Sequence, residues 1–488
     1  MAESVTEFVI RSTRVITPEG VRPATILIQG ETIVGLGAYE DTPADDVELR
    51  DVADLLVMPG IVDTHVHVND PGRASWEGFD YATRAAAAGG VTTIVDMPLN
   101  SRPATTSLSG FGQKREAMRG KCLVDVGLWG GVIPGNAGEL RSLYDAGVLG
   151  FKCFLVPSGV EEFPAVTEAD LREAMPILAE LGSPLLVHAE LPGPIEDATL
   201  ALANTEPRRY STYLKSRPPA AEVQAITMML RLAQEFDTHV HIVHVSSGES
   251  ASLLRKAREV GVKVTAETCP HYLFFQADDV PDRRYEFKCA PPIREGRDRT
   301  MLWEALKMGT LDLIASDHSP APPEMKNPPD ANFFTAWGGI ASLQMSLSAT
   351  WTRARKRGHS PEDIARWMCE GPAKLAGLSH RKGAIARGYD ADLVIWEPDA
   401  EFVVMPERLL HRHSSTPYAG RRLRGVVHET YVRGRRVYAE GVVDGEPNGS
   451  LVMRGGRMAS TDTREQRISR QFTPEFLQAI LPGEGEIT

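Results

Sequence analysis

Short apolar segments alternate with helix-like segments through the middle of this 488-residue chain. Eight of the apolar segments have the composition of buried strands: residues 55–66, 91–98, 123–132, 150–155, 184–190, 239–246, 263–274 and 311–319. The segments between them have helical composition, as at residues 76–90, 167–182, 219–236 and 246–261. This pattern predicts a parallel sheet covered by helices on both faces. Eight such units predict an α/β fold closed into a (β/α)8 barrel, and no GxGxxG sequence follows a strand to favour the alternative, an open doubly wound sheet.

The two ends of the chain have a different pattern, with short strands and turn signals in place of long helices. Residues 1–56 and 384–457 share this pattern, so we expect them to pair into one small β-sandwich beside a barrel of residues 57–383. Residues 458–488 contain one amphipathic stretch, TPEFLQAIL, in a polar setting. We expect these last residues to form a tail that packs on a neighbouring molecule or is partly mobile.

Composition argues against several classes of function. The formal net charge is −12, and the densest basic clusters, near Arg422 and Arg435, are short and lack interleaved aromatic residues, so nucleic-acid binding is not expected. No apolar run approaches the ~20 residues of a membrane span. The first residues lack the layout of a secretory signal, so we expect a cytoplasmic location. Five scattered cysteines without a CxxC pair indicate a reducing compartment and no disulfide framework.

The segment GIVDTHVHVND places His65 and His67 at the end of the first candidate strand. Residues i and i+2 of a strand point to one face, so both imidazoles could reach a single metal ion. The same spacing recurs at residues 239–241 and 411–413, so the motif alone is weak evidence. Position favours the first pair, because the active sites of such barrels lie at the carboxyl ends of the strands.

Lys152 lies inside the apolar strand VLGFKCFLV, where a charged ammonium would be costly to bury. Desolvation lowers the pKa of a buried lysine and leaves part of it as free amine. Such an amine can react with carbon dioxide to give a carbamate (N6-carboxylysine), whose two oxygens can bridge two cations. The alternative is a lysine with a buried stem and a head group in solvent.

Three further groups lie at the ends of three other candidate strands. His188 is in LLVHAE, His244 is in HIVHVSS, and Asp317 is in LIASDHS. Each of them alone could be a core histidine or a capping aspartate. Six such groups, all at strand ends that a barrel brings together, are better explained by two metal ions that share imidazole and carboxylate-like ligands.

These six positions resemble the ligand set of the amidohydrolase superfamily, in its two-metal branch with a carboxylated lysine. The resemblance covers nearly the whole chain and includes GAIARGYDADLVIWEPD, which is similar to the segment that closes the barrel in these enzymes. It implies two metal ions held by the six side chains: His65, His67 and Asp317 on the first ion, His188 and His244 on the second, and carboxylated Lys152 between them. It also implies zinc, or else manganese, cobalt or iron, as the metal, carbon dioxide for the carboxylation, and a homotetramer.

Within that branch, three groups of enzymes hydrolyse cyclic amides. Dihydroorotases carry an arginine two residues after the second motif histidine, where this chain has Asn69, and hydantoinases carry a tyrosine five residues after the bridging lysine, where it has Pro157. Six segments resemble the third group, the allantoinases: residues 65–79, 96–106, 216–223, 287–295, 316–326 and 336–344. That resemblance implies hydrolysis of the hydantoin ring of allantoin to allantoate. The alternatives are a hydantoinase or dihydropyrimidinase activity and a non-catalytic scaffold relative.

Asp317 is the expected base of this reaction, because a carboxylate near a metal-activated water could take its proton and return it to the leaving nitrogen. Allantoin is neutral and rich in amide groups, so Asn69, Asn100 and Ser319 in strand-end loops are candidate substrate contacts, with turn or capping residues as the alternative. Without a tyrosine at position 157, Ser158 or Ser319 is a candidate donor to the oxyanion.

Other residues near these motifs keep more than one interpretation. Cys153 and Cys289 are expected to be packing residues, since no base is marked out beside either. Trp337 either lines the pocket or packs in the core. His271 and His318 resemble family positions, but spacing assigns them no role.

Overall fold

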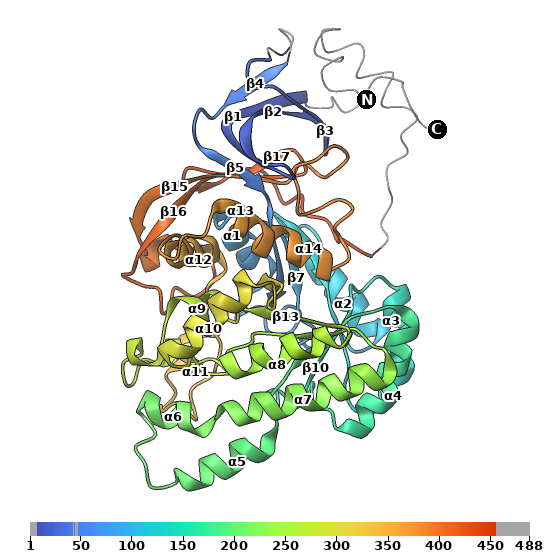
Figure 1. The fold of residues 1–488 in the computed structure, drawn as a ribbon, viewed down its shortest axis with the longest axis vertical. Coiled ribbons are helices and arrows are strands. Elements are labelled where there is room, and N and C mark those ends of the chain that lie inside the picture. The colour runs from blue at the N-terminus through green and yellow to red at the C-terminus, as the bar shows by residue number, and fades with distance from the viewer. Residues whose placement is uncertain (1–6, 42, 44–46, 455–488) are drawn as a thin grey trace.

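The computed structural model describes residues 7–41, 43 and 47–454. It contains a barrel of parallel strands surrounded by helices and, beside it, a sheet of mostly antiparallel strands (Figure 1). The predicted tail, residues 458–488, lies outside the described residues. In the part of the chain that is described, no helix is long and apolar enough to cross a membrane.

Both ends of the chain contribute to one nine-stranded sheet of the described residues. Its strands are β1 (Glu7–Thr17), β2 (Gly20–Gln29), β3 (Thr32–Gly37), β4 (Glu48–Asp51), β5 (Leu56–Pro59), β15 (Leu393–Val403), β16 (Arg422–Val432), β17 (Arg435–Ala439) and β18 (Val442–Val443). They pair in the order β18-β17-β16-β15-β5-β1-β2-β3, with β4 beside β1. β5 joins the two ends, because it pairs with β1 on one side and with β15 on the other. The predicted pairing of the chain ends is confirmed, and it takes the form of a single continuous sheet.

Local sequence explains how this sheet turns and packs. Arg433 and Gly434 connect β16 to β17 with φ angles of 47° and 77°, and a two-residue turn with two positive φ angles matches the twist of the flanking strands. Ile10, Ile26 and Leu393 are fully buried members of one apolar cluster on the sheet. Burial of such side chains contributes roughly 1.5–3 kcal/mol each to folding.

The barrel strands form two parallel sheets that meet to close a ring. They are β6 (Ile61–Val66), β7 (Val91–Asp96), β8 (Asp125–Leu128), β9 (Gly130–Gly131), β10 (Phe151–Phe154), β11 (Leu185–His188), β12 (Val240–Ile242), β13 (Val264–Thr268) and β14 (Leu313–Ile314). A parallel bridge between Val66 and His318 joins β6 to the chain after β14. The Leu149 amide donates to the Leu128 carbonyl at 3.0 Å, which joins β8 to the chain before β10. The predicted barrel is therefore confirmed.

Three of the candidate strands are divided differently from the prediction, and the third of the eight, residues 123–132, becomes β8 and β9. The first, residues 55–66, is split at Gly60 into β5 of the sheet and β6 of the barrel. Only glycine fits there, because a Cβ would lie 2.2 Å from Oγ1 of Thr92. The seventh candidate strand ends at Thr268, and Pro270 begins a short helix, because proline is favoured at the first helical position and cannot donate to a strand ladder.

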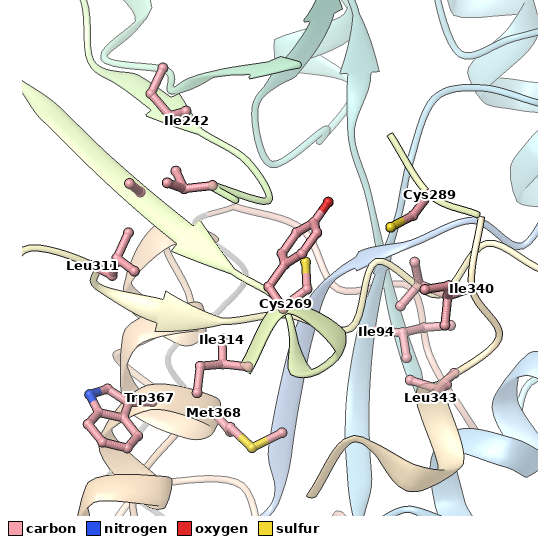
Figure 2. Packing of buried hydrophobic residues seen from close by; sticks show 14 of the residues in the cluster. Ile94, Ile242, Cys269, Cys289, Leu311, Ile314, Ile340, Leu343, Trp367 and Met368 are labelled. Carbon is pink, nitrogen blue, oxygen red and sulfur yellow. The ribbon is translucent and has the colours of Figure 1, made fainter. Parts of the chain in front are cut away.

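Helices cover the outside of the barrel (Figure 1). The α-helices of the described residues are α1 (Phe79–Ala88), α2 (Leu108–Met118), α3 (Leu140–Asp145), α4 (Glu168–Leu181), α5 (Pro192–Ala201), α6 (Tyr210–Ser216), α7 (Pro219–Phe236), α8 (Gly248–Glu259), α9 (Pro270–Phe274), α10 (Gly296–Lys307), α11 (Pro323–Lys326), α12 (Ser346–Arg355), α13 (Pro361–Ala365) and α14 (Gly371–Leu375). A capping box between Thr167 and Asp170 begins α4, and Gly182 at φ 60° ends it. Figure 2 shows part of the core that the strands and helices share, around Ile94, Ile242 and Ile314.

A buried ion cluster fastens the barrel to the sheet. Nζ of Lys382 lies 2.6 Å from Oδ2 of both Asp125, in β8, and Asp392, just before β15, and 3.0 Å from Oδ2 of Asp390. Burial alone would lower the pKa of Lys382, but the three carboxylates raise it, so the ammonium stays charged. The three aspartates are close enough together to hold a metal ion. Lys382 supplies positive charge to all three, and Arg381 and Arg433 add an ion pair to Asp390 and Asp125, so we assign this cluster a structural role.

Candidate metal centre and substrate cavity

The six predicted metal-ligating side chains are all buried, in or just after barrel strands. His65 and His67 lie at the end of β6, Lys152 in β10, His188 at the end of β11, His244 after β12, and Asp317 after β14. All of them except Lys152 line a cavity of about 380 Å³. The closed barrel thus brings residues that are far apart in the sequence to one end of the strands.

His65, His67 and Asp317 form a first group of potential ligands. One donor atom from each lies within 4.8 Å of the others, close enough to share a metal ion. Oδ1 of Asp317 lies 3.2 Å from Nε2 of His65 and 3.6 Å from Nε2 of His67. Oε1 of Glu267 lies 2.5 Å from Nδ1 of His65, so Nε2 is the nitrogen that faces Asp317. Nδ1 of His67 has no hydrogen-bond partner among the described residues.

His188 and His244 form a second group beside the first. Their ring centroids lie 4.6 Å apart, and the His244 ring lies 5.5 Å from that of His65. Nε2 of His188 lies 2.8 Å from Oε2 of Glu190, which also accepts from Arg217 at 2.5 Å. Glu190 engages only one ring nitrogen of His188, so Nδ1 is left for a ligand. In the described chain, Nδ1 of His244 is likewise without a hydrogen-bond partner.

Lys152 lies between these groups, with Nζ completely buried and no hydrogen-bond partner within the described ranges. Nζ lies 5.0 Å from the centre of the Phe154 ring, which stacks on His188 with centroids 4.6 Å apart. Burial lowers the pKa of Lys152 to about 8, against the attraction of Glu267. The head group does not reach solvent, so a reactive amine is the interpretation that its surroundings favour.

Neighbouring histidines lower the pKa of two buried carboxylates, and burial lowers the pKa of two imidazoles. Burial alone would raise the pKa of Asp317, but the neighbouring histidines, His65 first, lower it far below its usual range. Burial likewise would raise the pKa of Glu267, but its contacts with histidine lower it to about 2. Burial lowers the pKa of both His67 and His244, which leaves their lone pairs free for a cation near pH 7.

Three residues around the cavity hold left-handed backbone conformations. The φ angle is 65° at Asn69, 40° at His244 and 45° at Asp317. Such conformations cost a non-glycine residue about 1–3 kcal/mol and persist where the surrounding structure fixes them. Their occurrence at two potential ligands and one candidate substrate contact is typical of a functional site.

The candidate substrate contacts differ in their surroundings. Nδ2 of Asn100 donates to Oδ1 of Asn69 at 3.0 Å, and Asn100 lines the cavity whereas Asn69 is fully buried. Ser319 and Ser158 also line the cavity. The hydroxyl of Ser158 donates to the carbonyl of Phe163 at 2.6 Å, so in this conformation the hydroxyl proton forms a hydrogen bond within the loop.

Of the loop of residues 334–339, which forms one wall of the cavity, sequence reasoning named only Trp337. Nζ of Lys288 and Nζ of Lys326, both largely buried, donate to backbone carbonyls of this loop at 2.5 and 3.1 Å. Trp337 of the loop lines the cavity and packs edge-on against Trp76, with ring centroids 5.0 Å apart. A lysine within each of the apolar segments FKCAPP and PPEMK is the signal that could have pointed to this loop.

The two other His-x-His pairs lie outside the lining of the cavity. Nε2 of His239 and Nδ1 of His241 each lie 2.8 Å from the hydroxyl of Thr265. Nδ1 of His411 lies 2.7 Å from the backbone carbonyl of His413. The same spacing therefore has different roles, and position at a strand end separates them.

Comparisons with known proteins agree on one family. The sequence model described as "Amidohydrolase family" matches residues 56–437. A curated protein named allantoinase from Streptomyces avermitilis is 49% identical over 448 residues, which are 92% of this chain and 99% of that protein. An allantoinase from Arabidopsis thaliana is 45% identical and covers 91% of this chain and 90% of its own length.

Among solved structures, the L-hydantoinase (dihydropyrimidinase) from Arthrobacter aurescens has a similar fold. Its TM-score is 0.87 at 32% sequence identity, with 92% of this chain and 100% of that chain covered. The likeness extends over both the barrel and the nine-stranded sheet, because the aligned part exceeds the barrel alone.

Proposed function

The chain belongs to the amidohydrolase family, and from this premise we propose that it hydrolyses a cyclic amide, with allantoin as substrate and allantoate as product. The observation that carries the proposal is a cavity at the carboxyl ends of the barrel strands that is lined by five of the six buried side chains, with the sixth, Lys152, buried in β10. Similarity to allantoinases over nearly the whole chain supports allantoin as the substrate. A hydantoinase activity is the second candidate, favoured by the fold of the solved structures.

The side chains around the cavity suit two divalent metal ions. Orphaned donor atoms support this, because Lys152 Nζ, His67 Nδ1 and His244 Nδ1 are buried without a partner among the residues described. We assign one ion to His65, His67 and Asp317, the other to His188 and His244, and a bridging position to carboxylated Lys152. Nitrogen and oxygen ligands of this kind suit zinc, and also manganese, cobalt or iron. The chemistry that such ions supply is Lewis acidity, which polarises a carbonyl and lowers the pKa of water.

Lys152 would gain its bridging oxygens by carboxylation. The unprotonated Nζ attacks carbon dioxide, a nitrogen–carbon bond forms, and one proton leaves to solvent. Burial favours this reaction because it lowers the pKa of Lys152 to about 8 and so increases the share of free amine. The carbamate is a buried anion and therefore requires a cation beside it. The neighbouring imidazoles of His188 and His244 would hold that cation.

Asp317 is the residue that would move the proton. Water attacks the ring carbonyl carbon, and the carboxylate of Asp317 accepts the proton that the water loses. When the carbon–nitrogen bond breaks, the same proton passes to the leaving nitrogen. The strongly lowered pKa of Asp317 keeps it unprotonated before the reaction, as a base must be.

Neutral polar groups would hold the rest of the substrate. The amide of Asn100, paired with Asn69, and the hydroxyl of Ser319 offer donors and acceptors without a net charge, which suits a neutral ureide. Ser158 could assist the oxyanion after a rotation of its hydroxyl away from Phe163. A homotetramer, which the family resemblance implies, stays a prediction.

A substrate panel tests the proposal. Protein prepared with bicarbonate and zinc or manganese is assayed with allantoin, hydantoin, dihydrouracil and dihydroorotate. Allantoin should be turned over fastest, and Asp317→Asn should remove the activity. Turnover of dihydrouracil without turnover of allantoin would show that allantoin is the wrong substrate. If the metal-bound protein turned over none of the four compounds, the proposed reaction class would be wrong.

A further inference from the structure

A second group of potential metal ligands lies against Asp317. It consists of Cys269 and His271, which follow β13, together with Asp317, which follows β14. These strands are neighbours, with Thr268 paired to Ile314, so the residues after them emerge side by side. One donor atom from each of the three lies within 4.8 Å of the others. Figure 2 shows Cys269 at the end of its strand, inside the packed core.

His271 has surroundings that call for a ligand. Its side chain is 0% exposed, and neither Nδ1 nor Nε2 has a hydrogen-bond partner among the described residues. Other buried histidines have one, as His65 does with Glu267 and His188 with Glu190. A buried polar group without a partner costs free energy, so its retention in an apolar setting points to a partner that comes from outside the chain.

The donor atoms of this group differ from those of the group formed by His65, His67 and Asp317. Cys269 is buried and not part of a disulfide, so it offers sulfur beside the imidazole nitrogen of His271 and the carboxylate oxygen of Asp317. Zinc binds such mixed donors, and thiolate sulfur prefers soft or borderline cations over magnesium or calcium. The two other groups of potential ligands, His65 and His67 with Asp317 and His188 with His244, contain only nitrogen and oxygen donors.

We propose that Cys269, His271 and Asp317 form a further metal site, which binds a thiophilic divalent cation such as Zn²⁺ or Cd²⁺. Binding breaks the sulfur–hydrogen bond of Cys269, the proton goes to solvent, and the thiolate coordinates the cation. Asp317 belongs both to this group and to the group with His65 and His67. A cation at the further site therefore competes for the carboxylate that the proposed hydrolysis uses, and excess zinc inhibits the enzyme.

Cadmium gives a direct readout, because a cadmium–thiolate bond produces a charge-transfer band in the ultraviolet. Cd²⁺ is titrated into the full-length protein as purified, and the band is followed together with the bound metal. The wild-type protein should develop the band with one Cd²⁺ per chain. Cys269→Ser should abolish it, and His271→Gln should weaken Cd²⁺ binding by at least roughly tenfold.

Two other buried cysteines provide matched controls. Cys122 precedes β8, at the opposite end of the barrel strands, and Cys289 lines the cavity. Cys122→Ser and Cys289→Ser should both keep the band. No band in the wild-type protein, a band that survives Cys269→Ser, or a band lost in Cys289→Ser would each overturn the proposed site.

Inhibition supplies a second measurement. Each variant is assayed at increasing Zn²⁺ and compared with its own rate before excess zinc is added. Cys269→Ser and His271→Gln should need at least roughly tenfold more zinc for half inhibition than Cys122→Ser does. The cadmium band requires no turnover, so a protein that binds Cd²⁺ through Cys269 but does not hydrolyse allantoin would refute the proposed function alone.

Discussion

Oε1 of Glu267 lies 2.5 Å from Nδ1 of His65, and this contact turns Nε2 of His65 toward Asp317. Oε2 of the same glutamate lies 3.1 Å from Nε2 of His241, and all three side chains are buried. A carboxylate behind a metal-binding imidazole fixes its tautomer and orientation and raises its basicity. We therefore propose that Glu267 positions His65 in the cavity.

Glu267→Gln should lower the affinity for metal by about 10–100-fold, because an amide cannot accept from His65 and His241 as a carboxylate does. The measurement is the metal content of the protein after dialysis against a graded series of chelator concentrations. Glu249→Gln, an exposed glutamate in the first turn of α8, is the control and should retain metal like the wild type. Equal retention in both variants would show that Glu267 does not position a ligand.

Lys152→Ala should abolish hydrolysis, because the proposed bridge between the two metal ions is lost. Acetate or propionate, added at high concentration, should restore part of the activity by placing a carboxylate where the carbamate was. Turnover of the variant is measured with and without these acids, and the wild-type protein is measured with the same additions. Full activity of Lys152→Ala without any acid would remove the bridging role.

Five of the six groups lie at or just after strand ends, with Lys152 inside β10, and they could be predicted from the sequence because a barrel imposes a simple rule. Residues that end parallel strands meet on one side, whichever strands are neighbours. His188 and Asp317 could thus be placed together although 128 intervening positions separate them in the numbering. The closed barrel and the pairing of the chain ends followed from periodicity in the same way.

The partners of those groups could not be predicted, because they depend on which side chains meet across strands. Glu267 reaches His65 over the barrel interior, and nothing in the spacing of the two residues indicates this contact. The split of the first candidate strand at Gly60 also depends on a long-range contact, the close approach of Thr92. Ser158 illustrates the same limit, because its hydrogen bond to Phe163 arises from the fold of its own loop.

Lys382→Met should destabilise the protein by about 3–5 kcal/mol, because it leaves buried Asp392 without its ion-pair partner, whereas Asp390 keeps Arg381 and Asp125 keeps Arg433. The free energy of unfolding is measured by urea denaturation. Lys121→Met is the control, since Lys121 is partly exposed and its ion pair with Asp70, at 3.0 Å, should contribute no more than about 1 kcal/mol. A similar loss of unfolding free energy in Lys382→Met and Lys121→Met would contradict a special role for the buried ion cluster between the barrel and the sheet.

Glu77 should make stability depend on pH. It is fully buried 3.3 Å from Nε2 of His318, and burial raises its pKa from 4.5 to about 7, against the opposing effect of His411. The folded protein therefore binds more protons than the unfolded chain between these values. The stabilising contribution of Glu77 is complete below its unfolded pKa and is lost as the pH rises through about 7.

Glu77→Gln removes this proton linkage. From acid to mildly alkaline pH, the free energy of unfolding of Glu77→Gln should rise by about 3 kcal/mol relative to that of the wild type. Each unit of pKa shift corresponds to about 1.36 kcal/mol. Urea denaturation of both proteins at about pH 5 and about pH 8 measures it. If the unfolding free energies of the wild type and of Glu77→Gln changed with pH by the same amount, Glu77 would have the same pKa in the folded protein as in the unfolded chain.

Gly159 and Trp337 meet where two loops close the cavity, and this contact should control substrate binding. Gly159 has a φ angle of 92°, and a Cβ there would lie 3.2 Å from the indole of Trp337. Gly159→Ala should therefore displace Trp337 and raise KM by about tenfold, with a smaller effect on kcat, because Trp337 lines the cavity but is not one of the six potential ligands. Gly135→Ala is the matched control, since Gly135 has a φ angle of 78° but no atom within 4 Å of the added Cβ. Both variants pay about 1–2 kcal/mol for an alanine in a left-handed conformation, which urea denaturation measures. Only Gly159→Ala should change KM, and a similar KM in both variants would show that the wall formed by Trp337 does not contact the substrate.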